Sequence, residues 1–199
     1  MSDEQFEIKY YPEICILISK YLMDVLGDGY ELVYSMNKSL STMMSEIHTQ
    51  LGVSCGGTYF PALKTDIAFG IKGPRGDVAL LLIEVKRGKT LGLMNFSQLV
   101  GYLQVAKHIK VGLLLLVNEG AVKGSPLSSD FRSIIEVEQL PADWQVMNRR
   151  SGDTHDFKTG ICMYTLSNGI DWVDSDNCLG ISSWEALKNC LTWTVVSKL

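Results

Sequence analysis

Two uninterrupted apolar runs constrain the fold of this chain more than any other feature of its sequence. Residues 78–83 read Val-Ala-Leu-Leu-Leu-Ile, and residues 111–117 are likewise apolar throughout. A strand that is apolar at every position is typical of a sheet covered on both faces. The segment between the runs, about 95–109, has apolar side chains at helical spacing. A helix followed promptly by a buried strand is typical of α/β proteins, so the sequence predicts an α/β fold with a mixed central sheet flanked by helices.

Two further helices are expected before these runs. Pro12 suits the first turn of a helix over residues 12–26, which carries an apolar stripe. A second stripe predicts a helix over about 38–51, with Asn37 or Ser39 as its candidate N-cap.

The remaining elements follow from turn signals and short extended runs. A Gly-Pro-Arg-Gly turn at residues 73–76 indicates a hairpin between strands at 65–72 and 77–86. The other expected elements are a strand at 58–62, a helix at 130–138, strands at 144–149 and 157–166, and a helix at 183–191.

Composition and length fit one globular domain over residues 1–199, with a C-terminal extension from residue 118. No apolar stretch approaches the roughly 20 residues that span a bilayer, so a membrane partner is not expected. The acidic first five residues lack the basic region of a secretory signal, and the five cysteines form no Cys-x-x-Cys pair. These features predict an intracellular protein, in the cytoplasm or the nucleus.

Charge is distributed unevenly along the chain. The net charge is −4, but residues 64–110 carry a local +5 and the rest of the chain −9. A basic middle inside an acidic chain suits a nucleic-acid surface, although a solvated face gives the same pattern. The acidic remainder is a candidate surface for a protein partner or a second copy of the chain.

One constellation of side chains suggests chemistry. Glu84 directly follows the first apolar run, and Lys86 points to the same face of the strand two positions on. Asp66 lies across the expected hairpin, which can place it near Glu84. Two adjacent carboxylates repel unless a proton or a cation lies between them, and Mg²⁺ or Mn²⁺ prefers such oxygen ligands. The alternative is a strand-end ion pair between Glu84 and Lys86.

The following helix adds Gln98 and Tyr102, which lie close together at one edge of its apolar stripe. Gly101 beside them allows a close approach to that edge. An ordinary helix edge is the alternative interpretation.

Taken in order, Asp66, the Glu-Val-Lys sequence at residues 84–86, and the Gln-x-x-x-Tyr sequence at residues 98–102 resemble the PD-(D/E)XK nuclease superfamily. The resemblance is to its RecB-like and lambda-exonuclease-like branches and covers about residues 38–117. It implies a restriction-endonuclease-like αβββαβ core. Thr65 precedes Asp66 where many members have proline.

The resemblance also implies roles for individual residues. Asp66 and Glu84 would bind Mg²⁺ or Mn²⁺ with the backbone carbonyl of Val85, and Lys86 would position or activate the attacking water. Gln98 and Tyr102 would organise the site and touch the DNA backbone, and Glu46 corresponds to a further metal ligand in some branches.

The expected function is therefore a divalent-metal-dependent deoxyribonuclease, in repair, recombination, restriction or a mobile element. Two alternatives remain open, which are a noncatalytic nucleic-acid-binding module of the same fold and a protein-interaction or regulatory domain. RNA remains open as a substrate in place of DNA. The cations expected to contact phosphates are Arg75, Arg87, Lys89, Lys107 and Lys110.

Overall fold

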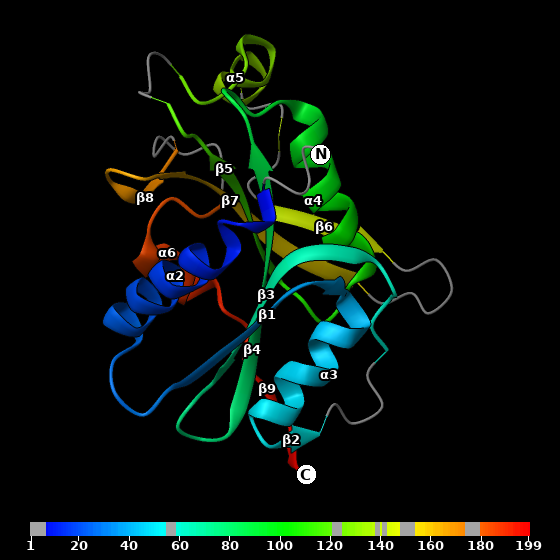
Figure 1. The fold of residues 1–199 in the computed structure, drawn as a ribbon. Helices are drawn as coiled ribbons and strands as arrows, with labels where there is room; N and C mark the ends of the chain where they lie inside the picture. The colour runs from blue at the N-terminus through cyan, green and yellow to red at the C-terminus, as the bar shows by residue number, and fades with distance from the viewer. Residues whose placement is uncertain are drawn as a thin grey trace.

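A mixed sheet of eight strands forms the centre of the protein, with helices on both of its faces (Figure 1). The computed structural model describes residues 7–54, 59–120, 125–137, 140, 143–147, 154–173 and 180–199. The helices are α2 (Tyr11–Leu26), α3 (Leu40–Gln50), α4 (Leu93–Val105), α5 (Ser129–Glu136) and α6 (Trp184–Cys190). The strands are β1 (Glu31–Ser39), β2 (Val53–Ser54), β3 (Lys64–Lys72), β4 (Asp77–Arg87), β5 (Val111–Val117), β6 (Asp143–Met147), β7 (Thr154–Thr165), β8 (Gly169–Trp172), β9 (Thr194–Val195) and β10 (Ser197–Lys198).

The sheet runs in the order β1-β3-β4-β5-β7-β6, with β8 added to β7 and β9 added to β4. The pairs β1–β3, β3–β4 and β7–β6 are antiparallel, whereas β4, β5 and β7 run parallel to one another. Every residue of β5 is buried, as its unbroken apolar sequence predicts for a strand covered on both faces. The predicted α/β class with a mixed central sheet flanked by helices is confirmed.

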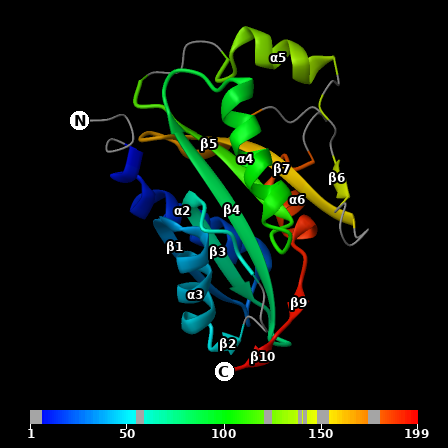
Figure 2. The same cartoon turned by 90° about the vertical axis from the view of Figure 1, so that its right-hand side faces the viewer.

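Two apolar layers fill the space on either side of the sheet. Helices α3 and α4 cover one face, and α2 and α6 cover the other (Figure 2). Alternation along β4 divides its side chains between the layers, so that Leu82 faces α3 and α4 while Ile83 faces α2. Glu84 and Lys86 continue the row of Leu82 and therefore belong to the face that α3 and α4 cover.

Several boundaries differ from the sequence expectation. The predicted strand at 58–62 is wrong, because residues 59–62 form no strand and residue 58 lies outside the described residues. The second helix begins at Leu40 with Ser39 as its N-cap, because the preceding residues extend as the edge strand β1. Helix α4 ends at Val105 rather than at residue 109, and the chain then turns into β5.

The C-terminal extension continues the same sheet instead of forming a separate one. Strand β7 pairs with β5, and β6 and β8 both pair with β7. The expected strand at 157–166 is observed with an earlier start, and the expected helices at 130–138 and 183–191 are observed as α5 and α6. Residues 138, 148 and 149 of the expected elements lie outside the described part. No helix in the described ranges is both long and apolar enough to cross a bilayer.

Candidate active site

The candidate site lies where β3 separates from β4. The paired register of these strands ends at Ile67 and Ile83, so Asp66 and Glu84 are the next residues on each strand. The charge of Asp66 acts on Glu84, so the two carboxyl groups lie close together, one on β3 and the other near the carboxyl end of the buried strand β4.

Both oxygens of Asp66 accept a hydrogen bond. The backbone N–H of Val85 donates to Oδ2 at 2.8 Å, and the hydroxyl of Tyr11 donates to Oδ1 at 2.8 Å. The N–H and C=O of one strand residue point to the same side, so the carbonyl of Val85 also faces the Asp66 side of β4. Asp66 therefore stands beside a backbone oxygen as well as beside Glu84.

Glu84 is a buried carboxyl group with incomplete hydrogen bonding. Only 1% of the residue is exposed, and Lys86 Nζ donates to Oε1 at 2.6 Å. Its other oxygen, Oε2, is buried and receives no hydrogen bond from the described residues. Burial, together with the charge of Asp66, raises the pKa of Glu84 to about 7 although Lys86 opposes the shift.

Lys86 remains a cation in this setting. Burial lowers the pKa of Lys86, but the charge and hydrogen bond of Glu84, with the charges of Asp66 and Glu7, outweigh burial and raise it overall. Its side chain is 22% exposed, so the ammonium group lies between the buried carboxylate and solvent.

The edge strand is distorted next to Asp66. Asn37 adopts the left-handed conformation with φ 54°, and the pairing of β1 with β3 skips from Met36 opposite Ile67 to Lys38 opposite Thr65. Asn37 and Asp66 are the skipped residues. Non-glycine residues in this conformation are uncommon, although asparagine tolerates it, and they cluster at functional sites.

The N-terminal segment closes over the same end of the sheet. Glu7 Oε1 accepts a hydrogen bond from the backbone N–H of Arg87 at 2.8 Å, and the Tyr10 hydroxyl donates to Glu119. Arg87 and Lys9 form ion pairs with Glu119 at 2.7 Å and 3.1 Å. The hydrogen bonds from Arg87, Tyr10 and Lys9 lower the pKa of Glu119 to about 2. Glu119 therefore ties the start of α2 to the end of β4.

Three predicted site residues lie outside this cluster. The Gln98 amide donates to the Tyr102 hydroxyl at 2.8 Å, and this pair on α4 has no hydrogen bond to the Asp66–Glu84 pair. Glu46 accepts from Ser35 at 2.6 Å and from Lys38 at 2.5 Å, and these contacts lower its pKa. In the part of the chain that the structure describes, no three His, Cys, Asp or Glu side chains gather closely enough to hold a metal ion. The structure thus does not bring Glu46 to Asp66 and Glu84 as a third ligand.

The predicted phosphate contacts are scattered. Arg87 ends β4 and Lys89 follows that strand, so both lie near the cluster, although Arg87 is paired with Glu119. Arg75 lies in the turn at the other end of the β3–β4 hairpin, about 30 Å away along the strand. Lys107 and Lys110 connect α4 to β5, and Lys110 Nζ lies 2.9 Å from His155 Nδ1 and 3.3 Å from an Asp156 oxygen. These five residues are therefore not one patch around the site.

Tyr11, Glu7 and Glu119 are the residues of this cluster that the sequence interpretation missed. Tyr11 precedes Pro12 at the start of a helix, a position that predicts a boundary but no contact with a strand 55 residues away. Glu119 lies just after the end of β5, and Arg87 ends β4. Because β4 and β5 are parallel, their carboxyl ends lie at the same edge of the sheet. The sequence could therefore have indicated that Glu119 lies near Arg87.

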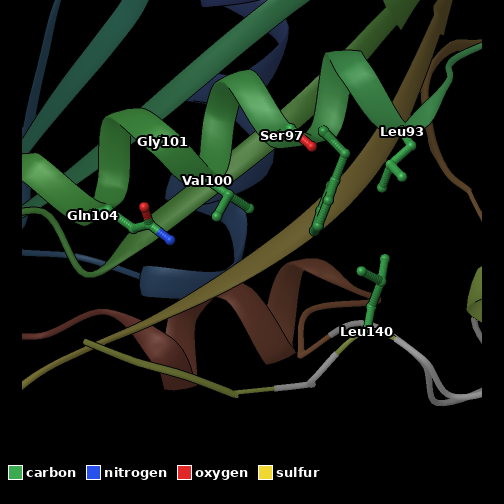
Figure 3. A pocket seen from close by; sticks show the side chains of 7 residues that line it. Leu93, Ser97, Val100, Gly101, Gln104 and Leu140 are labelled. Atoms are coloured by element: carbon green, nitrogen blue, oxygen red, sulfur yellow. The ribbon is translucent and has the colours of Figure 1, made fainter. Parts of the chain in front are cut away.

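A separate shallow pocket of about 300 Å³ lies along α4 (Figure 3). Leu93 lies over Leu140 at one end of it, and Val100 and Gln104 line it further along the helix. At 3.6 residues per turn, these positions lie on the opposite flank of α4 from Gln98 and Tyr102. None of the residues that line the pocket belongs to the carboxylate cluster.

Replacing Glu84 by glutamine is expected to stabilise the metal-free protein above pH 7, by up to about 3 kcal/mol. The folded protein keeps the proton on Glu84 up to a pKa of about 7, whereas the unfolded chain releases it near 4.5. The free energy of unfolding of the wild type consequently falls as the pH rises from 4.5 to 7. Glutamine does not titrate, so Glu84→Gln does not show this fall. Urea unfolding in EDTA at about pH 5 and about pH 8 measures the difference.

Glu31→Gln is the control for this experiment. Glu31 pairs with Lys72 at 3.0 Å, but its side chain is 60% exposed. Its replacement should change the free energy of unfolding by less than about 1 kcal/mol. A Glu84→Gln variant that is less stable than the wild type at the higher pH would show that Lys86 holds Glu84 in its charged form.

Comparison with known proteins adds no relative, since no family model, no curated protein and no solved structure matches the chain.

Proposed function

We propose that the protein is a divalent-metal-dependent deoxyribonuclease that hydrolyses phosphodiester bonds at Asp66, Glu84 and Lys86. The observation that carries this proposal is the buried carboxyl group of Glu84, which stands beside Asp66 and retains one oxygen without a hydrogen-bond donor among the described residues. Like charges in a buried setting are costly unless a cation or a proton offsets them. A hard dication between the two groups would satisfy both.

The order of elements supports the same interpretation. Helix α2, strands β1, β3 and β4, helix α4 and strand β5 follow one another as αβββαβ, with α3 and β2 between β1 and β3. This is the core order of the PD-(D/E)XK superfamily, and Asp66 and Glu84 occupy its second and third strands. The first helix of the core would then be α2 and not the helix at 38–51 that the sequence suggested.

The residues present fit a hard divalent cation. Asp66, Glu84 and the carbonyl of Val85 would hold it, because carboxylate and carbonyl oxygens are the ligands that Mg²⁺ and Mn²⁺ prefer. When bound there, the cation would supply positive charge for the phosphoryl oxygens and lower the pKa of water. Glu46 is not needed in this set.

Lys86 supplies the remaining group. Its ammonium group donates to Glu84 Oε1 at 2.6 Å and is partly open to solvent. From this place it can donate to a water or to a phosphate oxygen at the same site. Lys89 is exposed in the connection that follows β4 and is a predicted phosphate contact at this end of the sheet.

A cleavage assay tests the proposal. Purified protein is incubated with linear, circular, single-stranded and branched DNA, in Mg²⁺, in Mn²⁺ and in EDTA. We expect cleavage of at least one substrate with metal and none in EDTA. Asp66→Asn should reduce the rate by at least about 100-fold, because one anionic ligand is lost. Asp171→Asn, a change at an exposed strand aspartate, should retain the wild-type rate.

Other outcomes select the alternatives. Binding of DNA without cleavage in either metal would contradict the enzyme and favour a noncatalytic module of this fold. Absence of both binding and cleavage at low salt would contradict a DNA-directed function and favour the protein-interaction or regulatory domain. Equal cleavage by Asp66→Asn and wild type would point to a contaminating nuclease.

A further inference from the structure

We propose that Tyr11 is a positioning residue of the carboxylate site, which orients Asp66 for binding of the divalent cation. This inference rests on the proposed function and assigns to the N-terminal helix a part in the site. The hydroxyl of Tyr11 donates to Asp66 Oδ1 at 2.8 Å, although Tyr11 precedes Asp66 by 55 positions. The sequence motifs on the strands do not include Tyr11.

The geometry leaves Asp66 little freedom. Its two oxygens accept from donors on two different elements, the hydroxyl of Tyr11 on α2 and the N–H of Val85 on β4. Two such bonds fix the plane of the carboxylate, while each oxygen retains a further lone pair for a ligand. Ligating carboxylates in proteins are commonly held by hydrogen bonds of this kind.

Packing fixes the donor itself. Tyr11 is 1% exposed and belongs to the apolar layer between α2 and the sheet, which also includes Ile14 and Ile83. Tyr11 is the first residue of α2 and Pro12 follows it in the first turn, so the backbone there is restrained as well. Burial and the charge of Asp66 raise the pKa of Tyr11.

The alternative role is purely structural, because the same hydrogen bond ties α2 to β3. The two roles differ in what they affect. A structural tie changes the stability of the metal-free protein, whereas a positioning residue changes the affinity for the cation at a given stability. Tyr11→Phe removes only the hydroxyl oxygen and keeps the buried ring, so it separates the two.

The test measures Mn²⁺ binding by calorimetry, with thermal unfolding in EDTA as a separate readout of stability. We expect Tyr11→Phe to weaken Mn²⁺ binding about 10-fold, the effect typical of losing an outer hydrogen bond to a metal ligand. Cleavage at saturating Mn²⁺ should recover most of the wild-type rate. Tyr21→Phe is the matched control, because Tyr21 lies on the same helix and packs on Trp184 away from Asp66. It should bind Mn²⁺ as the wild type does.

The outcomes are distinguishable. If the wild type binds Mn²⁺ and cleaves DNA while Tyr11→Phe binds Mn²⁺ equally well, the role of Tyr11 is overturned and the proposed function stands. If the wild type neither binds Mn²⁺ nor cleaves DNA, both proposals fail. Should Tyr11→Phe unfold early, the Mn²⁺-dependent rise of its melting temperature, measured against that of Tyr21→Phe, still reports its affinity.

Discussion

Lys86→Met is expected to lower the rate of metal-dependent DNA cleavage by about 10³-fold at saturating metal, within the range typical of a group that handles a proton in the transition state. The variant removes the ammonium group that stands 2.6 Å from Glu84 Oε1 and keeps a flexible apolar side chain of similar length. Without that charge nothing in this position donates to a water or a phosphate oxygen. Single-turnover cleavage of a labelled duplex measures the loss directly.

Lys72→Met is the matched control for this change. Lys72 also ends a strand of the same sheet, pairs with Glu31 at 3.0 Å and is 24% exposed against 22% for Lys86. It lies at the other end of β3, so its removal should leave the cleavage rate within about 2-fold of the wild type. If Lys86→Met also kept the cleavage rate within this range, Lys86 would be only an ion-pair partner of Glu84.

Gly70→Val is expected to destabilise the protein by about 3 kcal/mol, the upper end of the usual cost of overpacking. Gly70 lies in β3 beneath α3, where an added Cβ would meet Ile47 Cγ2 at 2.2 Å and Leu51 Cδ1 at 3.1 Å. The methyl of Ile47 is attached to a branched carbon in the buried face of the helix, so it cannot swing aside. The helix must therefore move away from the sheet. Equilibrium unfolding in urea measures the change.

Gly101→Ala gives the comparison within the same fold. An added Cβ at Gly101 in α4 would meet nothing within 4 Å. Alanine favours a helix over glycine by up to about 1 kcal/mol, so this variant should be as stable as the wild type or slightly more stable. Equal losses in Gly70→Val and Gly101→Ala would refute the close packing of α3 on β3.

The sequence predicted the centre of the fold well because burial leaves an unmistakable pattern there. Strand β5 coincides with the predicted 111–117, and β4 extends one residue beyond the predicted 77–86. The edge strand β1 was missed, because its residues are mostly half-exposed and show no clear alternation.

The site divides in the same way. Asp66, Glu84 and Lys86 stand on the hairpin whose turn signal is local, so their proximity followed from short-range pattern. The hydrogen bond of Tyr11 depends on where α2 docks, and docking is decided by the whole apolar layer rather than by neighbours in the chain. For Glu46 the helix was predicted correctly but the contacts were not. The missed strand β1 carries Ser35 and Lys38, which both donate to Glu46.

The link between Tyr10 and Glu119 joins residues 109 positions apart. During synthesis, the ribosome must therefore deliver more than half of the polypeptide before this link can form. A product that stops before β5 lacks Glu119, so the Glu7–Arg87 and Tyr11–Asp66 hydrogen bonds alone would hold the start of its amino-terminal helix to the strand ends.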